Sequence, residues 1–285
     1  MGLDAKCHPY SDETLLFITD LHGHRRKYDR LFQTARKHHA RVVINGGDML
    51  PHGRDHSVQG RFITDYLDAH FAAFDAAGIH YLCCLGNDDY ATYDALFDAT
   101  CDKYPHVANL AQRKVEVGNW EFVGMNWVVD YPFRLKDRCR MDTQDYVFQE
   151  QFGTGLLSTP DGQQELTDWF AYAKTLPTIE DELERLVRPK NMARGVYVIH
   201  MPPHKLGLDE CAPGPKVGSK AIYDFLLKHQ PRLSLHGHIH ESPQVSGQWR
   251  AQLGHTTCIQ PGQLKPFTYV TLDLETMTFN RHTEP

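Results

Sequence analysis

Five polar clusters along the chain carry residue types that bind metal ions. They are Asp20-Leu21-His22, Gly47-Asp48, Gly86-Asn87-Asp88-Asp89, His200 and Gly237-His238-Ile239-His240. Carboxylate oxygens, an amide oxygen and imidazole nitrogens form a mixed ligand set that suits manganese, iron or zinc. Because the chain has 18 histidines in 285 residues, about one H-x-H pair is expected by chance. The histidine pairs therefore matter only if the fold brings them together with the other clusters.

Each of the five clusters lies at the end of a short apolar run. The runs are 15–19, 42–44, 79–85, 196–199 and 233–235. After the first run, Tyr28, Leu31, Phe32 and Ala35 have the spacing of one helix face. This strand–loop–helix alternation is typical of parallel sheets with buried strands, in which ligands collect beyond the carboxyl ends of the strands. We therefore expect the clusters to converge.

The rest of the chain has a different pattern. The tail from Ser242 to Arg281 alternates short strand-like pieces with turn residues, which predicts a second, mostly antiparallel sheet. Residues 120–129 resemble a strand, and residues 162–187 are predicted to form a helical pair. We interpret about 130–190 as an insertion over one edge of the site, within a single domain of residues 1–285.

Composition limits the partners and the location of the protein. The net charge of −6 argues against a nucleic-acid partner, because proteins that contact many phosphates have a basic bias. No apolar run approaches the roughly 18 residues that span a bilayer, so no membrane partner is expected. The segment from Met1 to Lys6 has neither a secretory signal nor a myristoylation motif. Seven cysteines, including Cys7, form no C-x-x-C pair, which predicts a reducing, cytoplasmic setting.

The order D-x-H, G-D, G-N-x-D, H and G-H-x-H resembles that of the calcineurin-like metallophosphoesterases. The resemblance covers most of the chain outside the middle insertion, and five blocks in order are far more specific than any one. It is nearest to small bacterial or archaeal phosphohydrolases of that superfamily. The resemblance implies an α/β fold in four layers, a double β-sandwich flanked by helices.

The resemblance also implies two bound metal ions. One ion would be held by Asp20, His22, Asp48 and His240, and the other by Asp48, Asn87, His200 and His238. The Asp48 carboxylate would bridge the ions, and a hydroxide between them would attack phosphorus in line. The neutral oxygen of Asn87 would leave net positive charge to meet an anionic phosphate.

Simpler explanations exist for single residues. Asp20 or Asp48 alone fits a helix N-cap after a strand, and His200 alone fits a core histidine with one hydrogen bond. Neither explanation accounts for the ordered set. His24 and His204 are close to the ligands in sequence and fit either surface histidines or contacts to a substrate phosphate.

Asp88 departs from the family pattern, because most members have a histidine after the asparagine that donates a proton to the leaving group. Two nearby cations should lower the pKa of an aspartate, which would make it a poor donor at neutral pH. Three explanations stay open: Asp88 orients the substrate or a neighbouring group, His204 or His24 supplies the proton, or the leaving group departs without help. Asp89 is expected to orient a neighbouring ligand.

We therefore predict a metal-dependent hydrolase of phosphomonoester or phosphodiester bonds in a small phosphorylated metabolite or nucleotide. A nuclease of the same superfamily is one alternative, which the acidic net charge and the lack of a basic, aromatic extension oppose. A non-catalytic scaffold, like the retromer subunit that keeps this fold without its metal ligands, is the other. Retention of all seven ligand positions opposes the scaffold.

Overall fold

The computed structural model describes residues 14–53 and 55–285. The N-terminal segment considered above, with Cys7, lies outside the described residues. Within the described ranges, no helix is long and apolar enough to cross a membrane.

The first of two six-stranded sheets carries the N-terminal apolar runs. Its strand order is β16-β15-β1-β2-β3-β4, and neighbours from β1 to β4 are parallel, whereas β15 and β16 pair antiparallel. The strands are β1 (Thr14–Ile18), β2 (Val42–Asn45), β3 (His80–Cys83), β4 (Val107–Asn109), β15 (Phe267–Asp273) and β16 (Thr278–Glu284). The carboxyl ends of β1, β2 and β3 therefore lie side by side.

The second sheet carries the later apolar runs. Its order is β13-β14-β12-β11-β6-β5, with parallel pairing from β14 to β6 and antiparallel strands at both edges. The strands are β5 (Lys114–Val117), β6 (Trp120–Met125), β11 (Gly195–Ile199), β12 (Leu233–Leu235), β13 (Arg250–Leu253) and β14 (Thr256–Ile259). The carboxyl ends of β11 and β12 are adjacent.

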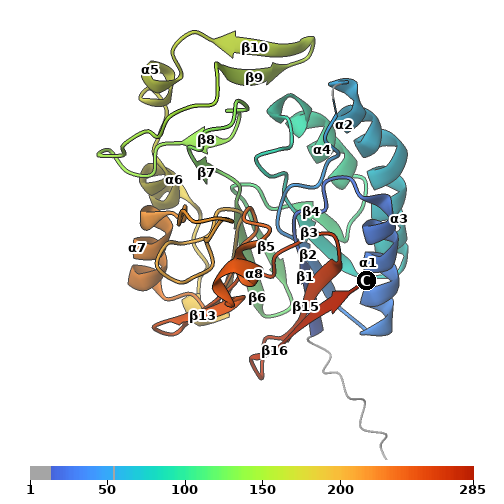
Figure 1. Cartoon of the computed structure of the whole chain (residues 1–285). Coiled ribbons are helices and arrows are strands. Elements are labelled where there is room, and N and C mark those ends of the chain that lie inside the picture. The colour runs from blue at the N-terminus through green and yellow to red at the C-terminus, as the bar shows by residue number, and fades with distance from the viewer. Residues whose placement is uncertain (1–13, 54) are drawn as a thin grey trace, which may run out of the picture.

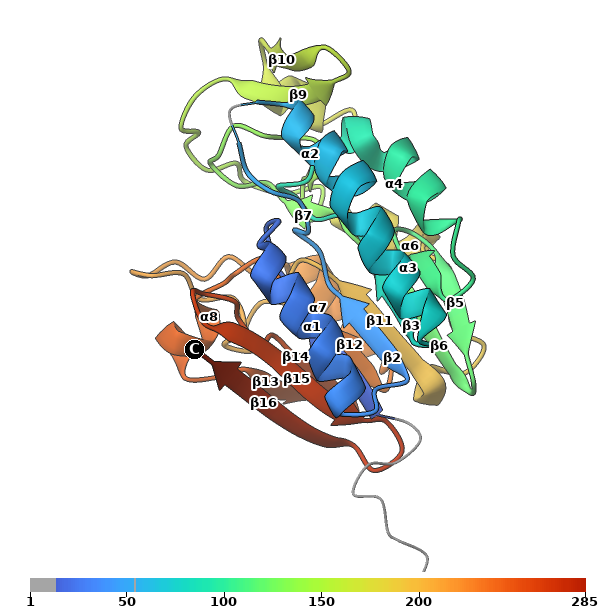
Figure 2. The ribbon, with the colours of Figure 1, turned by 90° about the vertical axis from the view of Figure 1, so that its right-hand side faces the viewer.

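The two sheets pack face to face, with helices outside them. Alternate residues of β1 face opposite layers: Leu15 and Phe17 join the core between the sheets, whereas Leu16 and Ile18 pack against helices. The first sheet is covered by α1 (Arg25–Lys37), α2 (Ser57–Phe62), the π-helical turn η1 (Ile63–Leu67), α3 (Asp68–Ala76), η2 (Ala91–Tyr93) and α4 (Asp94–Cys101) (Figures 1 and 2). The second is covered by α6 (Ile179–Arg185) and α7 (Lys220–His229). The expected four-layer α/β fold is confirmed.

The insertion differs in part from its prediction. It contains β7 (Val128–Val129), β8 (Cys139–Arg140), β9 (Gly155–Thr159), β10 (Gly162–Leu166) and α5 (Trp169–Ala173). The predicted helical pair at 162–187 is wrong at its start, because β10 forms a hairpin with β9. The connecting Pro160-Asp161 precedes Gly162, and such residues favour turns. Figure 1 shows the hairpin at the top of the molecule.

The tail does not form a sheet of its own, so that prediction is also wrong. Its first hairpin, β13–β14, extends the second sheet, and its second hairpin, β15–β16, extends the first. The short helices α8 (Ser242–Ser246) and η3 (Met192–Arg194) complete the elements. A sheet edge offers unpaired backbone groups, and each hairpin satisfies one such edge.

Candidate metal centre

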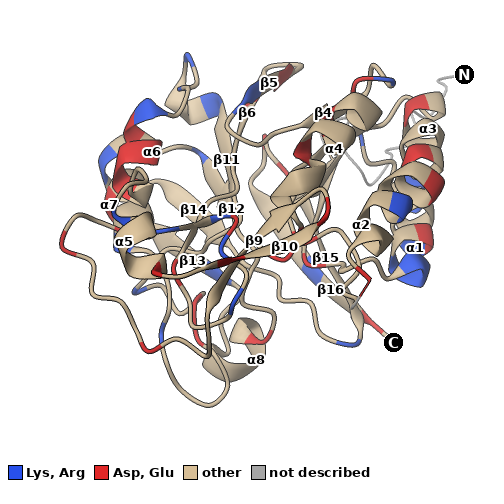
Figure 3. Ribbon diagram, turned by 90° about the horizontal axis from the view of Figure 1, so that it is seen from above, with Lys and Arg blue, Asp and Glu red and all other residues tan. Residues whose placement is uncertain are grey.

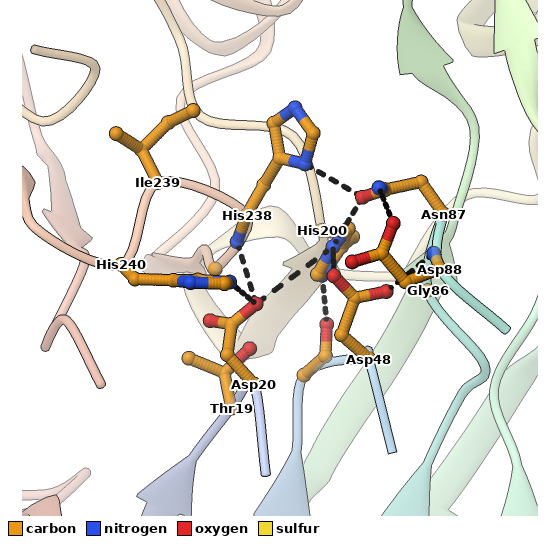
Figure 4. Close-up of polar contacts among 12 residues, drawn as sticks. Thr19, Asp20, Asp48, Gly86, Asn87, Asp88, His200, His238, Ile239 and His240 are labelled. Carbon is orange, nitrogen blue, oxygen red and sulfur yellow. Dashed lines mark hydrogen bonds and ion pairs between the residues drawn. The ribbon is translucent and has the colours of Figure 1, made fainter. Parts of the chain in front are cut away.

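All seven predicted ligands lie just beyond strand ends. The loops after β1, β2 and β3 carry Asp20, His22, Asp48 and Asn87, and those after β11 and β12 carry His200, His238 and His240. The site is therefore built where the open ends of both sheets meet. Figure 4 shows six of these side chains directed toward one another, those of Asp20, Asp48, Asn87, His200, His238 and His240.

Four of the side chains form the first cluster. Donor atoms of Asp20, His22, Asp48 and His240 all lie within 4.8 Å of one another. The Nε2 atoms of His22 and His240 are 3.0 Å apart, and Nε2 of His240 is 3.4 Å from Oδ1 of Asp20. This spacing allows one small cation to contact all four groups.

A second cluster adjoins the first through Asp48. It contains donor atoms of Asp48, His200 and His238, again within 4.8 Å of one another. Oδ1 of Asn87 lies between the two imidazoles, 3.0 Å from Nε2 of His200 and 2.6 Å from Nδ1 of His238. Asp48 thus belongs to both groups, and Asn87 adds a fourth donor to the second.

The backbone at four of these residues has an unusual conformation. The φ angles are positive at Asp20 (57°), His22 (43°), Asp48 (50°) and His238 (71°). Left-handed backbone is uncommon for residues with a side chain and costs free energy unless the surroundings enforce it. Such conformations gather at functional sites, and here they turn side chains from successive strand ends toward one point.

Two glycines allow the ligand loops to approach each other closely. A Cβ atom on Gly86 would lie 2.2 Å from Oδ1 of Asp48, and one on Gly237 would lie 2.8 Å from Oδ2 of Asp20. Both distances are shorter than real contacts to a Cβ atom. The glycines of the G-N and G-H motifs are therefore required by the packing of the loops.

Hydrogen bonds behind the site fix the orientation of two ligand loops. Nδ1 of His200 donates to the carbonyl oxygen of Gly46 at 2.9 Å, which leaves Nε2 directed into the site. The buried Asp89 carboxylate accepts from the amides of Gly86, Met49 and Leu50 at 2.7 to 2.9 Å. Asp89 thus braces the backbone of the loops that carry Asp48 and Asn87, in line with its expected role.

The site concentrates buried negative charge. Asp20 and Asp48 are 2% and 1% exposed, and their ion-pair partners among the described residues are histidines. Oδ2 of Asp20 has no hydrogen-bond partner there. Burial opposes ionisation, but His200 lowers the pKa of Asp48, and His240 lowers that of Asp20. Two ionised, buried carboxylates without an Arg or Lys partner require nearby positive charge.

The histidines respond to this charge in two ways. Burial works against protonation, yet Asp48 raises the pKa of His200 to about 9, and Asp20 does the same for His240. Burial instead lowers the pKa of His22 to about 4 and that of His238 to about 3. Among the protein groups alone, the first pair thus carries charge for the carboxylates and the second pair is neutral. Coordination requires neutral imidazole, so a cation at either cluster would replace the second ring proton of His200 or His240.

The donor chemistry fits metal ions at both clusters. The donors are carboxylate and amide oxygens and imidazole nitrogens, with no thiolate among them. Asp20, a member of the first cluster, has a buried oxygen without a hydrogen-bond partner among the described residues, and a neutral imidazole such as that of His22 or His238 has a nitrogen lone pair to offer. This donor set suits manganese, iron or zinc.

Asp88 lies at the edge of the centre. Its amide donates to Oδ1 of Asp48 at 2.8 Å, and its Oδ1 accepts from Nδ2 of Asn87 at 3.0 Å. Among the protein groups alone, burial and the Asp48 charge raise the pKa of Asp88 to about 8. The lowering that we expected would have to come from cations at the two clusters.

His52 is a residue that the sequence analysis missed. Its ring stacks on that of His22 at 4.4 Å, and its Nε2 lies 3.5 Å from Oδ2 of Asp88. The side chain is 58% exposed, so it also faces solvent at the mouth of the site. The only signal in the sequence is its place four residues after Asp48, in the same loop.

His204 and His24, considered above as possible contacts to a substrate phosphate, lie elsewhere, and so does the neighbouring His236. The ring of His204 packs edge to face on Tyr223 at 5.2 Å, on the side of α7, and its described contacts include none of the seven ligands. His24 is exposed at the start of α1. His236 is buried and directs Nδ1 to the carbonyls of Ile199 and Met201, away from the clusters.

Comparison with known proteins identifies the fold and the family. The solved structure of TT1561 from Thermus thermophilus aligns with a TM-score of 0.59 and 15% identity, covering 95% of this chain and 98% of that one. Another crystal structure aligns with a TM-score of 0.61 and 15% identity, covering 96% and 99%. At this identity the likeness shows the fold alone.

No curated protein sequence is similar enough to count as a match. The family model described as calcineurin-like phosphoesterase, however, matches residues 13–242, well over half of the chain. The matched range contains all seven predicted ligands. The chain therefore belongs to the calcineurin-like phosphoesterase family.

Proposed function

We propose that this chain is a dinuclear metal-dependent phosphoesterase that hydrolyses phosphomonoester or phosphodiester bonds of a small phosphorylated metabolite or nucleotide. The observation that carries the proposal is the shared position of the Asp48 carboxylate in two adjoining clusters. The proposed ligand sets are Asp20, His22, Asp48 and His240 for one ion, and Asp48, Asn87, His200 and His238 for the other.

The chemistry is divided between the ions and the chain. When bound, two such ions supply Lewis-acid charge and an activated water for in-line attack on phosphorus. The chain orients the donors, through the His200–Gly46 hydrogen bond and the Asp89 carboxylate that braces two loops. The uncharged oxygen of Asn87 leaves the centre net positive, which favours an anionic phosphate.

His52 is the group best placed to supply a proton to the leaving oxygen. It is exposed at the mouth of the site, and the Asp88 carboxylate, at 3.5 Å, holds and polarises it. Asp88 would then act as a positioning residue, which agrees with one of the three explanations for its departure from the family pattern. His204, which packs on Tyr223, has less support for this role.

The alternatives have weaker support. A nuclease needs a basic surface for the backbone of a polymer, but Figure 3 shows basic and acidic positions interspersed over the described chain, without a continuous basic band. A non-catalytic scaffold would gain nothing from two buried carboxylates among imidazoles, because burying charged groups costs free energy. The convergence of all seven candidate ligands supports the enzyme.

The same proposal extends to the domain organisation and the cellular compartment of the protein. We propose a single domain, with about 130–190 inserted over the strand ends. The described chain has six cysteines, and all are free thiols, which supports a reducing, cytoplasmic compartment.

The proposal is tested by metal content and turnover together. Purified protein incubated with manganese should contain about two transition-metal ions per chain by elemental analysis. Asp48→Asn should reduce hydrolysis of bis(p-nitrophenyl) phosphate by at least about 100-fold, because it removes the shared charge. Asp68→Asn, which changes a carboxylate paired with Lys103 at the start of α3, is the matched control. A chain that binds no metal, or an Asp48→Asn variant with unchanged turnover, would rule the proposal out.

A further inference from the structure

Two exposed phenylalanines of the insertion lie side by side near the candidate metal centre. Phe133 is 63% exposed and Phe152 is 69% exposed, and their rings meet edge to face at a centroid distance of 5.4 Å. Single exposed apolar residues are ordinary, but a preformed pair of rings in water presents a surface that binds other planar groups.

A row of rings connects this pair to a candidate metal ligand. We use the name aromatic row for Tyr131, Phe133 and Phe152. The Tyr131 ring lies 5.9 Å from the His238 ring and 5.8 Å from the Phe133 ring. The ring centroids of Phe133 and His238 are therefore at most about 12 Å apart, a distance that an extended mononucleotide can span. The row begins at the second cluster and ends in solvent.

The backbone holds the aromatic row in place. The amide of Phe152 donates to the carbonyl of Pro132 at 2.8 Å, and Nε of Arg134 donates to the carbonyl of Thr154 at 3.0 Å. The hydroxyl of the buried Tyr131 donates to the carbonyl of Leu135 at 2.9 Å. The two loops that carry the phenylalanines are thus tied to each other, so that the rings are presented in a defined geometry.

The insertion is also fixed relative to the metal centre. The buried Arg138 donates through Nε to the carbonyl of Gly86 at 2.7 Å, next to Asn87. The Asp137 carboxylate accepts from the amide of Ala91 at 2.9 Å. Because these contacts join the insertion to the third ligand loop, the distance between the aromatic row and the clusters is set by the fold.

We propose that the aromatic row is a nucleobase-binding subsite, so that the substrate is a nucleotide ester whose phosphate lies at the two clusters and whose base stacks on Phe133 and Phe152. This inference rests on the proposed phosphoesterase function and names its substrate class. Stacking on a neutral ring accepts any base, because every base has a π-face. The guanidinium of Arg134 beside the row is paired with Glu165, so the rings supply the main contact. The subsite should therefore select nucleotides over simple phosphoesters while discriminating little between bases.

The test compares two esters that share one leaving group, thymidine 5′-(p-nitrophenyl phosphate) and methyl p-nitrophenyl phosphate. The full-length manganese-loaded protein should have a kcat/KM at least about tenfold higher for the thymidine ester. Phe133→Ala and Phe152→Ala should each lower that kcat/KM by about 5- to 150-fold, the usual effect of losing one stacking ring. Hydrolysis of the methyl ester should not change. Phe170→Ala, which removes another exposed ring of the insertion, is the matched control.

A binding measurement separates this inference from the proposed function. In equilibrium dialysis with manganese, Phe133→Ala should weaken binding of thymidine 5′-monophosphate but not of inorganic phosphate. If neither ester is hydrolysed while this selective weakening is found, the hydrolase proposal fails and the subsite stands. If both esters are hydrolysed and Phe133→Ala changes neither hydrolysis nor nucleotide binding, the subsite is overturned and the hydrolase stands.

Two further outcomes would assign the rings to another occupant and overturn the subsite. Phe133→Leu keeps an apolar side chain without a ring, so full retention of the thymidine preference in this variant would indicate an apolar chain in place of a base. A dimer of the wild-type protein that Phe133→Ala dissociates, with nucleotide binding unchanged, would assign the pair to a contact between two copies. Sedimentation of both proteins at several concentrations measures this.

Discussion

Asp48→Asn should remove most of the stability that divalent metal ions give to this protein. Asp48 is the one member shared by both clusters among the described residues. Its Oδ1 accepts from the Asp88 amide at 2.8 Å, and its Oδ2 lies 3.3 Å from Nε2 of His200. Asparagine has nearly the same size and keeps an oxygen for the Asp88 amide. The substitution therefore removes charge from both clusters while disturbing the loop little.

The magnitude follows from linkage between binding and folding. A ligand at 100 times its dissociation constant stabilises the folded state by about 2.7 kcal/mol per site, so two sites give about 5 kcal/mol. For a chain of this size each kcal/mol raises Tm by about 2 °C, which predicts a rise of about 10 °C in the wild-type protein. Asp48→Asn should lose most of this rise. His22→Gln and His238→Gln each change one cluster and should lose about half.

The assay is a thermal melt of chelator-treated protein, repeated with increasing manganese. His24→Gln is the matched control, because His24 is an exposed histidine two residues from His22 and should leave the full rise in Tm. An Asp48→Asn variant that keeps the wild-type rise would refute the shared position of Asp48. A His22→Gln variant that loses the whole metal-induced rise in Tm would refute the expectation that the two sites contribute separately to stability.

Three other outcomes follow from the geometry. In chelator-treated protein, the free energy of unfolding should fall as pH rises from about 6.5 to about 9. The fold raises the pKa of His200 and His240 to about 9 and so stabilises their charged forms, and this stabilisation is lost as the two histidines deprotonate. Urea melts that show no such fall would contradict the charged state of this pair. His52→Gln should slow the hydrolysis of esters with poor leaving groups by about 100-fold or more and should slow the hydrolysis of p-nitrophenyl esters far less. Equal slowing of both reactions would mean that His52 donates no proton. Gly237→Ala should lower the free energy of unfolding by about 1–3 kcal/mol and weaken manganese binding, because the added Cβ atom would lie 2.8 Å from Oδ2 of Asp20. A variant with the melting temperature and the manganese affinity of the wild-type protein would contradict the close approach of these loops.

The strand–helix alternation was sufficient to predict the convergence of the motifs, whereas the four layers were expected from the family resemblance. Short buried strands followed by amphipathic helices have a local signature, and Asp20, Asp48 and Asn87 each lie within four residues of the end of such a strand. Parallel neighbours place their carboxyl ends at one edge, so local pattern and topology together determine the neighbourhood of these residues. This part of the site depends on little beyond element order.

The rest depends on contacts that no local pattern contains. His52 faces Asp88 only because the loop after β2 packs against the loop after β3. Its place four residues after Asp48 matches no motif, so this signal alone does not single it out among 18 histidines. The tail divides between two sheets because each had an unpaired edge, which is a property of the assembled fold. Aspartate adopts left-handed backbone more often than most residues, but only a minority of aspartates do so, and the sequence does not show that Asp20 and Asp48 are among them.

The position of the centre between the sheets connects folding to metal binding. Asp20, Asp48 and Asn87 come from one sheet, and His200 and His238 from the other. Closing the apolar core between the sheets forces buried carboxylates and imidazoles together, at a free-energy cost that includes the strained backbone and the lost hydration of two charges. Cations at the clusters would neutralise those charges and join the two sheets. Loss of metal should consequently loosen the strand-end face before the core between the sheets, and hydrogen exchange should detect this first in the loops after β1, β2 and β12.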